Sequence, residues 1–387
     1  MGYRSGLAGL AGADVPGGRA ALLSHYAAVS GSFIQSAIVV AEDPRIELEV
    51  LFGPQHGFRG ETQDNMIEWE DYTHPVLGIP VYSLYGETRE PLPGMLDGID
   101  VFFVDIQDVG SRYYTYVYTM ALCLRKCAEA GIPAVILDRP NPLGLRIVEG
   151  RPLDPDFSSF VGMYPLPARH ALTVGELARL FCRIDGLPDP QVVPMQECPP
   201  DGFPGDAPWI LPSPNMPFHS TAQVYPGMCL FEGTNLSEGR GTTRPFEIFG
   251  APWIDSDILA LELNDSIFME GARLRPHSFI PTFSKHSGEL CGGAQMHVTD
   301  PAAFRPLRAA LGILLHCSRY DETSWLQPPY EYEYDRMPVD ILAGGTAVRR
   351  AIDEGDADTL IGLAEGDPAG HADSVSGLLL YEREFRS

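Results

Sequence analysis

Short apolar runs alternate with helix-like stretches along the first half of the chain. The runs are bounded by Gly, Pro or Asp and have the length of strands. Between two of these runs, residues 113–130 have the apolar spacing of a helix that ends at Gly131. Farther along the chain, Thr173 and Glu176 have the spacing of a capping box, which predicts a structural role for Glu176. This alternation predicts an α/β fold with a mostly parallel sheet covered on both faces. The predicted strands are 19–24, 47–53, 80–85, 99–105 and 134–138, and the other predicted helices are 32–42 and 173–184.

The pattern changes after the first half. Residues 188–217 carry ten prolines and little periodicity, which predicts extended chain crossing the surface. Helices and strands are mixed beyond this segment, as expected for a smaller α+β domain. We therefore predict two domains, 1–215 and 216–387. In the second, we expect strands near 278–283 and 294–298 and helices near 257–270, from Asp300-Pro301 and after Pro338.

Composition fits a globular protein and disfavours two classes of partner. The 387 residues are 44% hydrophobic, enough for a sizeable core. The formal net charge is −25, and a field of this sign repels phosphate groups. We therefore expect neither nucleic acid nor a membrane surface as a partner. No stretch approaches the roughly 20 apolar residues of a membrane span.

The cysteines indicate a reducing compartment. Their number, seven, is odd, they are widely spread, and they contain no C-x-x-C motif. Cys123 and Cys127 have the spacing of one helix face, for which two buried free thiols are the expected state. Residues 1–18 contain no apolar block of signal-peptide length. We therefore predict a cytoplasmic protein.

Several kinds of chemistry lack their motifs. The sequence has no G-x-S-x-G, Walker A or H-E-x-x-H motif, and no G-x-G-x-x-G follows the first predicted strand. The ten histidines are dispersed without metal-ligand spacing. We therefore expect no metal and no cofactor.

Three polar segments follow predicted strands, where an open parallel sheet forms its ligand crevice. Four apolar residues precede Asp105, so its carboxylate is expected to be partly buried and to need a partner such as an arginine. Asp138 in the third segment is equally compatible with a structural ion pair. The candidate ligand groups are Gln55, His56, Arg59 and Glu61 in the first segment, Asp105, Gln107, Asp108 and Arg112 in the second, and Asp138 and Asn141 in the third.

A fourth segment, residues 231–247, concentrates polar groups with few apolar ones. It contains Glu232, Asn235, Glu238 and Arg240, planar groups that suit the hydroxyls of a sugar. The aromatic and acidic run 329–335 is a candidate rim of a cleft, although an exposed loop or an edge strand explains it equally well.

Together these segments resemble the NamZ/YbbC-like family of exo-β-N-acetylmuramidases, which remove terminal N-acetylmuramic acid from peptidoglycan fragments. The resemblance implies a Rossmann-like N-terminal domain, a family-specific C-terminal domain, an active site in the groove between them, and a small carbohydrate or muropeptide substrate. The lack of a signal-peptide block favours intracellular recycling of cell-wall fragments. The matching stretches include Gly53-Pro-Gln-His-Gly-Phe-Arg-Gly60, Asp105-Ile-Gln-Asp-Val-Gly-Ser-Arg112, Asp138-Arg-Pro-Asn-Pro142, Pro212-Ser-Pro-Asn-Met216 and Glu232-Gly-Thr-Asn-Leu-Ser-Glu-Gly-Arg-Gly-Thr242.

One position departs from the family pattern. The first motif of the family usually reads Pro-Glu-His-Gly, and its glutamate is a candidate catalytic residue, whereas this chain has Gln55. An amide cannot act as a carboxylate base or nucleophile. Either Glu61 supplies the carboxylate, or the catalytic pair lies elsewhere, or this branch acts on another ligand.

Glycoside hydrolysis normally needs two carboxyl groups, one of which protonates the leaving oxygen. We expect Glu232 or Glu238 to pair with Glu61 or Asp105 across the groove. Binding of the lactyl carboxylate of the muramic sugar is assigned to Arg59, Arg112 or Arg240, and other substrate contacts to Gln55, His56, Gln107, Asp108, Asn141 and Asn235.

Two alternatives stay open at this point. The first is a non-catalytic sugar- or muropeptide-binding protein, in which Gln55 marks the loss of hydrolysis. The second is a hydrolase of another class, such as a metal-dependent one, that uses Asp105, Asp108 and Asp138.

Overall fold

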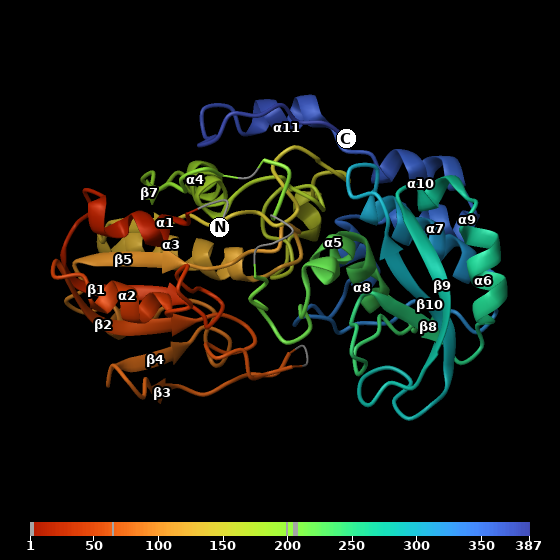
Figure 1. Cartoon of the computed structure of the whole chain (residues 1–387), viewed down its shortest axis with the longest axis horizontal. Coiled ribbons are helices and arrows are strands. Elements are labelled where there is room, and N and C mark those ends of the chain that lie inside the picture. Colours follow the sequence, from red (N-terminus) through yellow and green to blue (C-terminus); the bar gives the residue numbers. More distant parts are fainter. Residues whose placement is uncertain (1–3, 64–65, 199, 204–207) are drawn as a thin grey trace.

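The first part of the chain forms a mixed, mostly parallel sheet (Figure 1). In the computed structural model, which describes residues 4–63, 66–198, 200–203 and 208–387, this sheet has seven strands in the order β3-β4-β2-β1-β5-β6-β7. Neighbouring strands are parallel except β3 and β4. The strands are β1 (Gly18–Ser24), β2 (Ile46–Gly53), β3 (Tyr72–Thr73), β4 (Pro80–Ser83), β5 (Val101–Asp105), β6 (Ala134–Leu137) and β7 (Gln191–Val193).

Both faces of this sheet are buried, as the sequence predicts. Successive residues of β5 alternate between two apolar clusters, because side chains along a strand point to opposite faces. Phe102 and Val104 join the cluster that contains residues of α3 (Tyr116–Ala130) and α4 (Val174–Asp185). Val101 and Phe103 join the cluster that contains residues of α1 (Gly6–Gly9) and α2 (Ser36–Ala41).

The second part contains a smaller antiparallel sheet in the order β8-β10-β9 (Figure 1). Helix α6 packs against β9 and β10, and α5 packs against α7. The apolar cluster on the α3 and α4 side of the first sheet continues into this part through Phe231, Phe249 and Leu311. The elements are α5 (His219–Met228), β8 (Ile248–Ala251), α6 (Ser256–Leu263), β9 (Ala272–Phe279), β10 (Cys291–Val298), α7 (Pro306–Cys317), α8 (Pro338–Ala343), α9 (Ala347–Glu354), α10 (Ala357–Ala364) and α11 (Pro368–Ser374).

The residues after α11 return to the first part of the chain and bind to the start of α4. The predicted capping box is present, with Thr173 and Glu176 each bonded to the backbone of the other. Arg383 donates to both oxygens of Glu176, at 2.6 and 2.7 Å, and both side chains are fully buried. Glu176 is therefore structural, as the sequence predicts.

Some element predictions differ from the structure. The strand predicted at 278–283 lies at Ala272–Phe279, where buried and exposed positions alternate at its start. The helix expected from Asp300 begins at Pro306, because the Asp300 carboxylate accepts the amides of Ala302 and Ala303 in a turn. The short strand β7 and helix α5, which contains Pro226 in its interior, are not predicted from the sequence.

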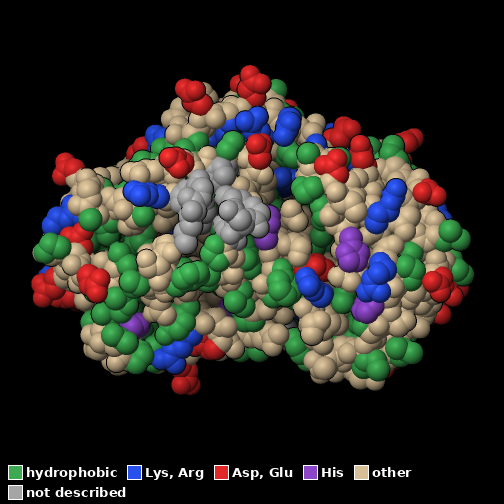
Figure 2. All heavy atoms as spheres, viewed as in Figure 1, with side chains coloured by type: hydrophobic (Ala, Val, Ile, Leu, Met, Phe, Trp, Pro, Cys, Tyr) green, Lys and Arg blue, Asp and Glu red, His purple; other side chains and the backbone are tan. Residues whose placement is uncertain are grey.

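The outer surface carries charges of both signs. On the face in Figure 2, basic side chains are interspersed with acidic ones and form no broad basic patch. Within the described ranges, no helix is long and apolar enough to cross a membrane.

Candidate active site

A polar pocket lies between the two parts of the chain. The first part contributes the loop after β2 and the segment before α3, and the second part contributes the end of α5, the polar segment 231–247 and the run 329–335. Its walls include Gln55, His56, Tyr113, Tyr114, Thr115, Ser213, Asn215, Met216, Tyr225, Cys229, Glu232, Arg240, Phe246, Tyr330 and Glu331.

Glu232 is the carboxylate on the side of the second part. It lies in the 3-10 helix η4 (Cys229–Gly233) and is 6% exposed. Its Oε1 accepts from Nη2 of Arg240 at 2.7 Å, and its Oε2 accepts from the hydroxyl of Tyr330 at 2.6 Å. Donors on both sides therefore hold the two oxygens of Glu232 in position.

Glu331 is a second carboxyl group of the pocket, and the site prediction did not include it. It lies in a turn closed by two backbone hydrogen bonds between Tyr330 and Glu333. Its φ of 46° is left-handed, a conformation that is uncommon for residues other than glycine. Its Oε2 accepts from the hydroxyl of Tyr85 at 2.9 Å, and the side chain of Gln55 also bonds to it.

The environment of Glu331 favours the protonated carboxyl group. Burial, together with the nearby charge of Glu232, raises the pKa of Glu331 to about 7. The hydrogen bonds from Tyr85 and Gln55 act in the opposite direction. Near neutral pH, Glu331 is therefore able to hold a proton that it can donate.

Gln55 and His56, two of the candidate ligand groups, line the pocket. Oε1 of Gln55 accepts from the hydroxyl of Thr115 at 2.7 Å, which orients the amide nitrogen toward Glu331 as the donor. Nδ1 of His56 lies 2.8 Å from the carbonyl oxygen of Thr62. Gln55 thus connects the first part of the chain to the buried carboxyl group of the second.

Tyrosines form much of the pocket wall. The rings of Tyr113 and Tyr114 each contact that of Tyr225 edge to face, with centroids 6.3 and 6.4 Å apart. The hydroxyl of Tyr113 is buried and has no hydrogen-bond partner among the residues that the structure describes. Its charged neighbours include Arg112 and Glu149, neither of which lines this pocket.

Glu238 is buried behind this wall. It lies 3.3 Å from Nε of Arg240, and Nζ of Lys285 donates to it at 2.9 Å. Lys285 also donates to the carbonyl oxygens of Phe231 and Leu236. Glu238 therefore holds the polar segment together, whereas Arg240 contacts both carboxylates and lines the pocket.

Arg59 and Glu61 lie outside the pocket lining. The guanidinium carbon of Arg59 lies 4.0 Å from the centroid of the Tyr72 ring. The exposed carboxylate of Glu61 accepts the backbone amide of Arg59 at 3.1 Å. These contacts stabilise the loop after β2.

The residues after β5 also have other partners. Asp105 forms a buried ion pair with Arg139, which confirms the predicted arginine partner. Gln107 donates to the carbonyl oxygens of Asp108 and Pro140. Asp108 accepts the amide of Gly110 at 2.7 Å. Asp105 and Asp108 therefore maintain the end of the sheet rather than face the pocket.

Three more candidate residues bond to the backbone. Arg112 is almost completely buried and donates to the carbonyl oxygens of Arg151, Leu166 and Leu342, so it links the two parts of the chain. The amide of Asn141 donates to Leu172, and that of Asn235 donates to Glu322. None of the three lines the pocket.

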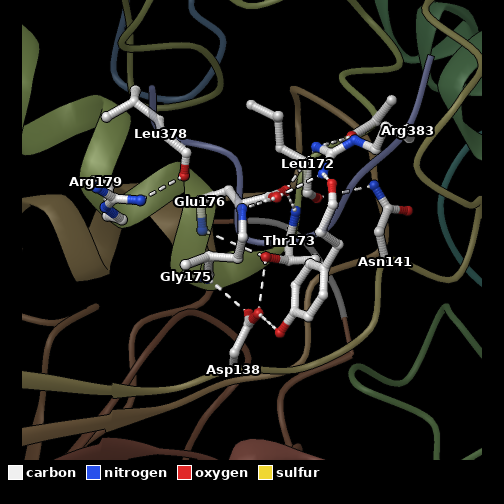
Figure 3. Close-up of polar contacts among 12 residues, drawn as sticks. Asp138, Asn141, Leu172, Thr173, Gly175, Glu176, Arg179, Leu378 and Arg383 are labelled. Carbon is white, nitrogen blue, oxygen red and sulfur yellow. Dashed lines mark hydrogen bonds and ion pairs between the residues drawn. The ribbon is translucent and has the colours of Figure 1, made fainter. Parts of the chain in front are cut away.

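Asp138 anchors the C-terminal segment (Figure 3). Its Oδ2 accepts from the hydroxyls of Tyr381, at 2.7 Å, and Thr173, at 2.9 Å. Its Oδ1 accepts the amides of Gly175 and Arg139. Burial raises the pKa of Asp138 to about 7. These contacts explain Asp138 structurally and give no support to a catalytic role.

The predicted pairing of Glu238 with Asp105 across the groove is wrong, because Asp105 pairs with Arg139 and Glu238 with Lys285. Arg59 packs on Tyr72 instead of facing the pocket. The structure instead brings Gln55, His56, Glu232 and Arg240 together with Glu331. The aromatic and acidic run 329–335 was the sequence signal for Glu331. In the described part of the chain, no three His, Cys, Asp or Glu side chains are grouped as metal ligands.

Known proteins match the whole length of this architecture. The model of the exo-β-N-acetylmuramidase NamZ N-terminal domain matches residues 20–220, and that of the C-terminal domain matches residues 223–381. The chain is 44% identical over 348 residues to the peptidoglycan β-N-acetylmuramidase NamZ of Bacillus subtilis (strain 168), covering 88% of this chain and 81% of that protein.

Two solved structures have the same fold. Both are DUF1343 family proteins from Bacteroides fragilis NCTC 9343, with TM-scores of 0.84 and 0.72 and identities of 27% and 26%. Each comparison covers 98% of this chain and 99% of the other. The resemblance seen in the sequence is confirmed, and the chain belongs to the NamZ family of exo-β-N-acetylmuramidases.

Proposed function

We propose that this protein is an exo-acting glycoside hydrolase that releases terminal N-acetylmuramic acid from peptidoglycan fragments. The observation that carries the proposal is the pair of carboxyl groups, Glu232 and Glu331, in one pocket with different surroundings. Two such groups are what glycosidic cleavage requires. The family and its B. subtilis member, a peptidoglycan β-N-acetylmuramidase, support this reaction.

Glu331 is the proposed general acid. A glycosidic oxygen leaves readily only when a proton reaches it, and a carboxyl group with a pKa of about 7 carries that proton at neutral pH. Tyr85 and Gln55 hold the carboxyl group in place from the first part of the chain. The left-handed turn fixes it from the second part.

Glu232 is the proposed second carboxylate. The transition state carries positive charge on the sugar ring, and an ionised carboxylate beside the ring stabilises that charge. Arg240 and Tyr330 fix the position of both Glu232 oxygens. Because Arg240 lines the same pocket, it is also the proposed partner of the lactyl carboxylate.

Gln55 is proposed to orient the acid. The amide bonds to Thr115 on one side and Glu331 on the other, so it occupies the position where a glutamate would place a charge beside the acid. The presence of Gln55 where the family usually has glutamate is compatible with hydrolysis, because Glu232 and Glu331, the two carboxyl groups of the pocket, come from the second part of the chain. Glu61 is not needed.

Two further assignments belong to this proposal. The structure has seven free cysteines, six of them buried, which fits a reducing compartment and therefore recycling of peptidoglycan fragments in the cytoplasm. The domain boundary near residue 215 is retained because the next helix, α5, packs against α7 of the second part. Fractionation of cells that express the tagged protein tests the proposed location in the cytoplasm.

The test of the proposed function is incubation with the disaccharide N-acetylmuramyl-β-1,4-N-acetylglucosamine, followed by mass spectrometry of the products. We expect the reaction to give the two free monosaccharides. We expect it to proceed without added metal and in the presence of a chelator. Saturable binding of the disaccharide without cleavage would instead identify a non-catalytic muropeptide-binding protein.

A further inference from the structure

An exposed aromatic side chain directly follows the proposed acid. Tyr330 and Glu331 are 8% and 4% exposed, whereas Tyr332 is 42% exposed. Tyr332 also has a left-handed φ, of 65°, so the turn changes direction at this point. The chain thus passes from the pocket wall to the surface within three residues.

Residues of the first part hold the Tyr332 ring in place. The guanidinium carbon of Arg89 lies 4.8 Å from the centroid of Tyr332 and 3.9 Å from that of Tyr85, and it therefore contacts both rings. Oε1 of Glu68 accepts from the hydroxyl of Tyr332 at 3.2 Å and lies 3.7 Å from Nη2 of Arg89. We call Glu68, Arg89 and Tyr332 the rim cluster.

The rim cluster combines the groups that bind a pyranose. An aromatic ring packs against the apolar face of a sugar through dispersion, and planar carboxylate and guanidinium groups bond to its hydroxyl and amide groups. The side chains of Glu68 and Arg89 are 52% and 22% exposed, so both are accessible from solvent. Their mutual contacts fix the geometry before a ligand arrives, which lowers the entropic cost of binding.

The position of the acid places the leaving sugar beside this cluster. A general acid must lie within hydrogen-bond reach of the oxygen that it protonates. In an exo-acting enzyme the terminal sugar lies on the inner side of the acid, so the leaving sugar extends from Glu331 toward solvent. Tyr332 is the chain neighbour of Glu331 on that side, and Arg89 packs on Tyr85, which bonds to Glu331.

We propose that the rim cluster is a binding subsite for the sugar on the leaving side of the cleaved bond, an N-acetylated pyranose that packs on Tyr332. This inference rests on the proposed function and adds the residues that recognise the remainder of the substrate. Arg89 and Glu68 are assigned to the hydroxyl and acetamido groups of that sugar.

The experiment compares two substrates, the muramyl-glucosamine disaccharide and methyl β-N-acetylmuramide, which lacks a leaving sugar. For Tyr332→Ala, we expect kcat/KM for the disaccharide to fall roughly ten-fold more than that for the methyl glycoside, as loss of one aromatic contact predicts. Tyr332→Phe retains the ring and should stay within about three-fold of the wild type on both substrates. Tyr334→Ala, at a tyrosine of the same run that is 69% exposed, is the matched control and should leave both values unchanged.

The outcomes separate this inference from the proposed function. If the wild-type protein cleaves neither substrate, the proposed function is wrong. If the wild type cleaves both and Tyr332→Ala lowers both values equally or neither, the subsite is wrong and the hydrolase assignment is unaffected. A loss in Tyr332→Phe as large as that in Tyr332→Ala would contradict packing on the ring.

Discussion

The hydroxyl of Tyr85, in the first part of the chain, donates a 2.9 Å hydrogen bond to Glu331, in the second part. The two residues are 246 positions apart in the sequence. The position and the protonation of the proposed acid therefore depend on how the two parts pack together. Catalysis in the pocket requires both.

Tyr85→Phe tests this dependence. The hydrogen bond from Tyr85 favours the ionised form of Glu331 and lowers its pKa, so its removal should raise that pKa. The alkaline limb of the kcat/KM profile should then move to higher pH, as measured on the disaccharide. Tyr334→Phe, on the exposed side of the same turn, is the control. A limb that stays in place would mean that Tyr85 does not influence the acid.

Glu232 and Glu238 should differ in what their amide variants lose. Glu232→Gln should lower kcat by roughly 100-fold or more, because its carboxylate faces the reacting sugar. Glu238→Gln should lower the free energy of unfolding by about 1–3 kcal/mol, because it weakens the contact with Lys285, and should retain much more activity. Turnover and urea unfolding of both variants measure the difference. A large loss of activity in Glu238→Gln and a loss only of stability in Glu232→Gln would show that Glu238 is the catalytic carboxylate and Glu232 the structural one.

Gln55→Glu restores the residue usual in the family motif and should raise the pKa of Glu331. A second carboxylate beside Glu331 disfavours its ionised form. The alkaline limb of the activity profile should move to higher pH. Thr115→Val, which removes the partner of Gln55 without adding a charge, is the control. An unchanged limb would show that residue 55 is too far from the acid to affect it.

Tyr381→Phe should weaken the anchor of the C-terminal segment on Asp138. Loss of this donor to a buried carboxyl group should lower the free energy of unfolding by about 1–3 kcal/mol. The folded-state pKa of Asp138 is raised to about 7, so the group is mostly protonated at pH 5 and mostly ionised at pH 8. The ionised form needs the donor more, and the loss should be larger at pH 8. Urea unfolding at the two pH values measures it, and a larger loss at pH 5 would contradict this account.

The sequence predicts the sheet of the first part well because its strands are apolar runs between turn residues. Val101–Asp105 and Ala134–Leu137 are buried on both faces, and such strands need no distant information to be recognised. Helix α5 escapes prediction because Pro226 and the proline-rich segment before it hide the helical pattern.

The site is predicted only in part, because a polar loop does not reveal which of its groups face the ligand. Gln55, His56, Glu232 and Arg240 line the pocket, but Asp108, Asn141 and Asn235 bond to backbone groups of their own surroundings. Glu331 was missed as a catalytic candidate because its burial depends on Tyr85 and Gln55, which lie far away in the sequence.

The role of Glu331 as the acid is tested by kcat/KM of the wild type and of Glu331→Gln on the muramyl-glucosamine disaccharide, measured between pH 5 and 9. We expect the wild-type value to fall as pH rises through about 7, the pKa of Glu331. Because an amide cannot donate a proton as a carboxylic acid does, kcat/KM of the variant should be roughly 100-fold or more lower at neutral pH. The fall of kcat/KM with rising pH should also disappear. A variant that stays folded with wild-type activity and the same pH profile would contradict the claim that Glu331 is the acid.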